Sequence, residues 1–187
     1  DGSYRCASTQ QGYSPFSTWT RGLAWAILGL SEILEYISNL NPESLEELSV
    51  PGMTDQKNTI ERIRAAAIAT ADFYIANTAA DGIPYWDTEA PGLNSLGDWR
   101  AVTSDPFNSC EPVDSSAAAI AAQGFLRLGV ILGKESQYSI AGLTIAKTLF
   151  SDPYLAVNEK HQGILLHTIY HRPNGWDYVP NGQTIPC

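Results

Sequence analysis

The chain has 187 residues, of which 44% are hydrophobic and 17% charged, so it fits one globular domain with enough apolar side chains for a core. Its net charge of −9 and its 11 scattered Lys and Arg residues exclude a nucleic-acid or anionic-membrane partner, because phosphates are met by clustered basic side chains. No stretch approaches the roughly 20 uninterrupted apolar residues of a membrane span. The cysteines Cys6, Cys110 and Cys187 are odd in number and lack metal-ligand spacing, so we expect free thiols, no metal and no cofactor.

Helical periodicity marks two segments in the first half of the chain. Residues 17–39 carry apolar side chains on most faces, which predicts a buried helix. Residues 54–77 carry a single apolar stripe, with Thr54 and Asp55 suited to the N-cap region. This second segment is therefore predicted to be an amphipathic, partly solvated helix.

Two further helices are predicted in the second half. One begins at Asp114, a strong N-cap signal, continues through an alanine-rich run and ends near Gly133. The other covers residues 136–150 and stops before Pro153. Buried and solvated helices thus alternate along the chain. That pattern is typical of stacked helical hairpins, so we predict an all-α fold of about four long helices plus a long loop.

The long loop covers residues 78–113 and contains many turn signals, together with Tyr85, Trp86 and Trp99. Long irregular loops in compact domains are often functional, and flat aromatic side chains stack on the apolar faces of sugars. The alternative is that these aromatic residues anchor the loop to the body of the protein. Asp87, next to Trp86, is a loop acid whose role the sequence leaves open.

Arg21 and Trp25 are the strongest candidates for a binding site. Their i, i+4 spacing places them on one face of the first predicted helix. An arginine cannot shed its charge, so Arg21 in an apolar helix needs a carboxylate, carbonyl groups or an anionic ligand. Two interpretations stay open, an anionic-sugar site at the mouth of a helical barrel and a structural ion pair with a loop aspartate.

Asp114 also has two interpretations, a helix N-cap and a functional carboxylate. His167 and His171 are four residues apart, which would suit a shared metal on a helix. The apolar residues before His167 and the proline at position 173 favour an extended segment instead. With no third ligand evident, no metal site is expected there.

Three stretches, taken in order, resemble the unsaturated glucuronyl hydrolases, glycoside hydrolase family 88. The stretches are 10–12 with 17–25 (QQG and STWTRGLAW), 81–87 with 114–120 (DGIPYWD and DSSAAAI), and 163–167 with 170–171 (GILLH and YH). The resemblance implies an (α/α)6 barrel and removal of a 4,5-unsaturated uronic acid from lyase-generated oligosaccharides. In that reaction an acidic side chain protonates C4, water adds at C5, and the resulting hemiketal opens to release the sugar.

The resemblance also implies which residues bind substrate. Gln11, Arg21, Trp25 and Tyr170 match positions that line the family's substrate pocket. Further possible site residues, from the motifs and the loop, are Asp114, Trp86, Asp87 and His171. The family's paired catalytic aspartates lie upstream of the Gln-Gly stretch, and this sequence has no positions that match them. No catalytic residue is therefore assigned, and the chain is expected to be a fragment-like, incomplete barrel, inactive by itself.

Removing the rest of such a barrel would expose apolar inner helix faces, which favours a homo-oligomer. The expected partner is an unsaturated uronic-acid oligosaccharide, with no nucleic acid and no membrane. Two alternatives stand beside this hypothesis. One is a minimal active hydrolase that uses Asp114 or Asp87 with a second carboxylate across a dimer. The other is a non-catalytic carbohydrate-binding or helical scaffold module. The sequence leaves the compartment open, with bacterial cytoplasm or periplasm favoured over a membrane.

Overall fold

The computed structural model describes residues 6–41, 43–44, 56–158 and 162–175. Its long helices are α1 (Thr20–Ser38), α3 (Gln56–Ala76), α4 (Ser115–Leu132) and α5 (Gln137–Leu149). Two short 3-10 helices, η1 (Pro91–Leu96) and η2 (Arg172–Asn174), lie in the connecting segments. The four helices predicted from periodicity are confirmed. The N-cap predicted at Thr54 and Asp55 lies outside the described residues.

The first helix begins three residues later than the sequence pattern indicated. Trp19 is its N-cap residue and forms an isolated antiparallel bridge with Asp87, so the chain is extended at Trp19. The backbone N–H of Thr20 donates to the carbonyl of Trp86 (3.1 Å), and its hydroxyl donates to the carbonyl of Tyr85 (2.8 Å). The loop therefore satisfies one of the four backbone N–H groups that a helix start leaves without a partner inside the helix.

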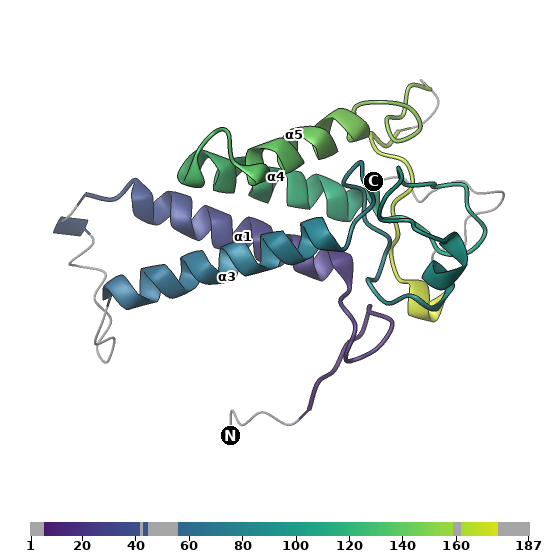
Figure 1. The fold of residues 1–187 in the computed structure, drawn as a ribbon, viewed down its shortest axis with the longest axis horizontal. Helices are drawn as coiled ribbons and strands as arrows, with labels where there is room; N and C mark the ends of the chain where they lie inside the picture. Colours follow the sequence, from purple (N-terminus) through teal and green to yellow (C-terminus); the bar gives the residue numbers. More distant parts are fainter. Residues whose placement is uncertain (1–5, 42, 45–55, 159–161, 176–187) are drawn as a thin grey trace.

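The helices form two layers of parallel neighbours. Arg21 near the start of α1 lies beside Asp114 at the start of α4, and Glu35 near the end of α1 pairs with Arg127 on α4, so these two helices run parallel. The helices α3 and α5 form the second layer and run the opposite way, as Figure 1 shows. Two stacked hairpins, α1–α3 and α4–α5, result from this arrangement, which is the unit from which an (α/α)6 barrel is built.

The core lies where the two hairpins meet. The α1–α4 contact depends on small residues, since a Cβ added at Gly124 would lie 2.8 Å from the backbone nitrogen of Leu28 and equally close to Ile27. Phe125 of α4 is fully buried between the rings of Tyr74 and Tyr138, at centroid distances of 5.3 and 6.5 Å. These aromatic contacts join α3 and α5 to α4.

The expectation that the first helix is buried on most faces is wrong for this chain. The face of α1 toward α3 and α4 is buried, whereas Trp25, Ile33 and Tyr36 are exposed. Within the described ranges, no helix covers that face. Further exposed apolar side chains are Val130 on α4 and Ile140 and Leu143 on α5. Self-association through such faces stays a prediction.

The helix α4 is long and apolar enough to cross a membrane by length and composition alone. Half of it is buried inside the protein, where it packs between α1 and α5. The core helix of a soluble protein passes the same composition test, so this finding is weak evidence for a membrane span.

The long loop returns to the point from which it departs. Tyr85 and Val113 form an antiparallel bridge, and the N–H of Asp114 donates to the carbonyl of Pro84 (2.8 Å). Together with the Trp19–Asp87 bridge, these contacts hold both ends of the loop at the helix end where α1 and α4 begin, and Figure 1 shows the loop gathered there.

Candidate functional site

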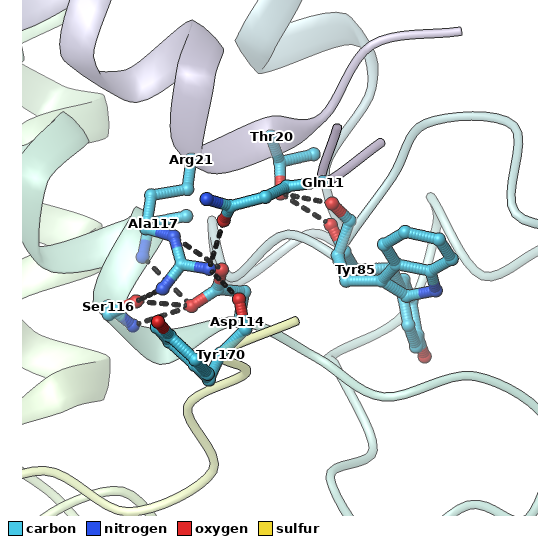
Figure 2. Close-up of polar contacts among 9 residues, drawn as sticks. Gln11, Thr20, Arg21, Tyr85, Asp114, Ser116, Ala117 and Tyr170 are labelled. Carbon is cyan, nitrogen blue, oxygen red and sulfur yellow. Dashed lines mark hydrogen bonds and ion pairs between the residues drawn. The ribbon is translucent and has the colours of Figure 1, made fainter. Parts of the chain in front are cut away.

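The candidate site lies where α1 and α4 begin, and Figure 2 shows its polar contacts. The Nε of Arg21 lies 3.7 Å from Oδ2 of Asp114, and their side chains are 15% and 0% exposed. A second nitrogen of the guanidinium, Nη1, donates to the hydroxyl of Ser116 at 3.4 Å. Of the two interpretations that the sequence left open for Arg21, the structure supplies the ion pair, with the N-cap aspartate of α4 as its partner.

Asp114 caps α4 as predicted. Its Oδ1 accepts hydrogen bonds from the N–H groups of Ser116 and Ala117, both at 3.1 Å, and from the hydroxyl of Ser116 at 2.5 Å. Burial raises the pKa of the Asp114 carboxyl, and the Arg21 charge and these hydrogen bonds oppose that rise. The carboxylate thus combines the capping role with the pairing of a cation.

Residues from both flanks of the chain complete the cluster around Arg21. Its Nη2 donates to the backbone carbonyl of Tyr170 at 2.9 Å and to Oε1 of Gln11 at 3.4 Å. The guanidinium also lies over the Trp19 ring, 5.1 Å from the centroid. Gln11 and Tyr170, which only the resemblance pointed to, are therefore brought together with Arg21 from positions 159 residues apart in the sequence.

Trp25 lies one turn further along α1 and is 56% exposed. An exposed indole close to a guanidinium suits the stacking of a sugar ring. Two hollows among the described residues, of about 360 and 320 Å³, lie elsewhere, and neither is lined by Arg21 or Trp25. Substrate contact with Trp25 stays a prediction.

Trp86 and Asp87 have internal partners. The indole N–H of Trp86 donates to Oε2 of Glu111 at 2.8 Å. Asp87 is fully buried and accepts hydrogen bonds from the N–H of Tyr13 and the hydroxyl of Ser17, both at 2.9 Å. These contacts favour the interpretation in which the residues anchor the loop to the body of the protein.

The histidines lie in the segment that crosses the start of α4. His171 is buried, and its Nδ1 accepts a hydrogen bond from the N–H of Asn174 at 3.3 Å. The preceding stretch is extended where Leu165 bridges Leu155, as the sequence indicated. In the part of the chain that the structure describes, no group of three His, Cys, Asp or Glu residues is placed to hold a metal.

Two serines of the site were interpreted only as helix-start signals. Ser116 contacts both Arg21 and Asp114, and Ser115 holds the later segment by donating its N–H to the carbonyl of His167 (3.0 Å) and its hydroxyl to that of Leu166 (2.6 Å). The Asp-Ser-Ser motif was the signal that could have revealed them, because serine hydroxyl groups readily hydrogen-bond to backbone groups.

His167 predicts a pH dependence of stability. It is buried between the rings of Phe107 and Tyr154, at centroid distances of 5.0 and 5.7 Å, and burial lowers its pKa below 6.5, while Asp152 opposes the shift. A lowered pKa means that the unfolded state binds the proton more readily. This contribution to stability is therefore present above pH 6.5 and lost as the pH falls through the folded-state pKa.

The measurement is urea unfolding of the wild type and of His167→Asn as a function of pH. Asparagine tolerates the positive φ of 64° at this position. We expect the wild type to lose stability relative to the variant as the pH falls below about 6.5. Parallel pH profiles for the two proteins would contradict the assignment.

The chain belongs to the class of proteins built of stacked helical hairpins, with a polar cluster at the helix end where α1 and α4 begin. No protein-family model matches the chain. It is 29% identical over 177 residues to the unsaturated glucuronyl hydrolase of Formosa agariphila, covering 94% of this chain and 34% of that protein. It is also 29% identical over 181 residues to the enzyme of the same name from Bacillus sp. strain GL1, covering 95% of this chain and 38% of that protein.

Solved structures of unsaturated glucuronyl hydrolases are also similar to this chain. The unsaturated glucuronyl hydrolase of Bacillus sp. GL1, responsible for the degradation of glycosaminoglycan, superposes with a TM-score of 0.63 at 26% identity, covering 89% of this chain and 36% of that one. A mutant of the Streptococcus agalactiae enzyme complexed with dGlcA-GalNAc6S superposes with a TM-score of 0.59 at 24% identity, covering 90% and 36%. The resemblance and the partial-barrel fold predicted from the sequence are confirmed. The chain spans about a third of the length of the curated relatives it matches.

Proposed function

We propose that this chain supplies the uronate-binding side of a glycosidase that removes 4,5-unsaturated uronic acids from oligosaccharides, and that the catalytic acids are not among its residues. The observation that carries the proposal is the Arg21 guanidinium at the helix end where α1 and α4 both begin. It is supported by the similarity to unsaturated glucuronyl hydrolases, one of which was captured with dGlcA-GalNAc6S.

Arg21 has the chemistry that a uronate requires. A planar guanidinium donates two parallel hydrogen bonds to a carboxylate, and the start of a helix favours a negative charge. The contacts from Arg21 to Gln11 and Ser116 are both long, at 3.4 Å, so an incoming carboxylate has partners that it can replace. Trp25, exposed one turn away, can cover a face of the sugar ring.

The acids of the cluster do not suit proton donation to the sugar. Asp114 is fully buried, with Oδ1 committed to the start of α4 and Oδ2 facing Arg21. Asp87 is fully buried as well, and it holds the segment before α1. A general acid has to reach the atom that it protonates. These two carboxyl groups therefore support binding and structure rather than catalysis.

The test is calorimetry with an unsaturated uronic-acid disaccharide, together with the loss of ultraviolet absorbance that hydration of the double bond would cause. We expect the chain to bind the disaccharide without turnover, and Arg21→Met to weaken binding by at least about tenfold, because the charged contact is lost. Arg127→Met is the control, and binding is compared under conditions in which both variants are folded. The Arg127 substitution removes an ion-paired arginine that joins the same two helices at their other end.

Each other outcome has a distinct meaning. Turnover that Asp114→Asn abolishes would contradict the absence of a catalytic acid. No binding at millimolar disaccharide would support a helical scaffold module instead, which the internal ion pair of Arg21 also favours. Equal loss of binding in Arg21→Met and Arg127→Met would show a general structural effect and contradict the assignment of the site to Arg21.

A further inference from the structure

We infer that Asp114 is a positioning residue that fixes the orientation of the Arg21 guanidinium for an anionic ligand, in addition to its capping of α4. For the identity of the ligand the inference rests on the proposed function. Its structural part, the control of Arg21 by a carboxylate 93 residues away in the sequence, stands on geometry alone.

The two oxygens of Asp114 have separate tasks. Oδ1 accepts all three hydrogen bonds that the carboxylate receives from Ser116 and Ala117, which satisfies the capping role. Oδ2 is fully buried and has no hydrogen bond among the described residues, and it lies 3.7 Å from Nε of Arg21. A cap needs only one acceptor oxygen. The burial of Oδ2 without a hydrogen bond is therefore explained by its pairing with the Arg21 cation, not by capping.

A serine elsewhere in the chain shows what capping alone requires. Ser136 caps α5, and its hydroxyl accepts a hydrogen bond from the N–H of Ser139 at 3.4 Å. That cap uses a short neutral side chain, whereas the start of α4 has a carboxylate kept fully buried. Burial of a carboxylate is costly unless a cation and hydrogen bonds compensate. The cost of burying an aspartate at position 114 is therefore compensated by Arg21 on α1.

Two of the contacts made by the terminal nitrogens of the guanidinium are long, at 3.4 Å, so a ligand carboxylate can replace them. Asp114 faces Nε, the nitrogen closest to the helix, while the terminal nitrogens face Gln11, Ser116 and the carbonyl of Tyr170. Stacking on Trp19 fixes the plane of the group from one side. The Asp114 charge lies beside Nε at 3.7 Å, and together with these contacts it sets the direction of the terminal N–H groups, so a carboxylate can bind with a smaller ordering cost.

Asp114→Asn is the decisive variant, because asparagine caps helices as well as aspartate and has the same shape but no charge. The first measurement is the NMR signal of the Arg21 Nε–H. We expect a resolved, slowly exchanging signal in the wild type and an averaged, fast-exchanging one in Asp114→Asn. The second is calorimetry with the unsaturated disaccharide and with its uncharged methyl ester. We expect Asp114→Asn to bind the charged sugar about tenfold more weakly and the ester unchanged.

Ser136→Ala is the control, since it removes a helix cap without touching Arg21. We expect it to lower thermal stability while both the Nε–H signal and the affinity stay as in the wild type. An unchanged Arg21 signal in Asp114→Asn would overturn the inference whether or not any sugar binds. A wild type that shows the ordered signal but no affinity for the disaccharide would sink the proposed function and leave the positioning of Arg21 intact.

Discussion

Replacing Gly124 by valine is expected to lower the free energy of unfolding by about 3 kcal/mol, because the new side chain would collide with the backbone of α1. A Cβ at this position lies 2.8 Å from the Leu28 nitrogen, closer than real Cβ atoms approach another heavy atom. Two of the three nearest atoms, the nitrogen and Cα of Leu28, belong to helix backbone, which cannot rotate away, so the two hairpins would have to separate. Urea unfolding followed by circular dichroism measures the effect.

Gly29→Ala is the matched control, because Gly29 is also a helical glycine of the α1–α4 pair but has no atom within 4 Å of an added Cβ. We expect this variant to gain up to about 1 kcal/mol from the higher helix propensity of alanine. If both variants lost stability to the same extent, the loss in Gly124→Val could not be attributed to its close contact with α1.

Arg21→Met is expected to destabilise the fold by about 3 kcal/mol, since it leaves the fully buried Asp114 carboxylate without its cation. Adding Asp114→Asn to that variant should recover much of the loss, because no buried charge remains. The two single variants and the double variant form a cycle whose coupling energy denaturant unfolding measures.

Arg127→Met provides the contrast. Arg127 pairs with Glu32 and Glu35, but the three side chains are 38%, 52% and 39% exposed. Pairs exposed to this extent contribute about 0–1 kcal/mol, because water already solvates the charges. A loss for Arg127→Met as large as that for Arg21→Met would mean that burial does not determine the energy of these pairs.

Local features of the fold could be predicted well from the sequence. Asp114 caps α4 as expected, and α5 begins one residue after the predicted start at position 136, because helix starts depend on a side chain and the next three residues. The start of α1 was placed too early. The reason is the bridge between Trp19 and Asp87, a contact across 68 residues that helical periodicity does not encode.

The candidate site was predictable only in part for the same reason. The need of Arg21 for a counter-charge followed from its place in an apolar helix, and the sequence interpretation named an aspartate partner. Which aspartate it is depends on α1 and α4 running parallel with their starts side by side. Tyr170 contributes a backbone carbonyl, a group that every residue carries, so its side chain gave no indication of the contact.

The closure of the long loop has a consequence for how sequences of this kind can diversify. Since Tyr85 pairs with Val113, the intervening chain departs and returns at one place. Lengthening a segment that is already closed costs little entropy, about 0.6 kcal/mol for each doubling. Insertions at exposed positions between these residues, away from the Trp86 and Asp87 contacts to the start of α1, would leave the α1–α4 framework in place, so evolution or protein engineering can remodel this surface independently of the Arg21 cluster.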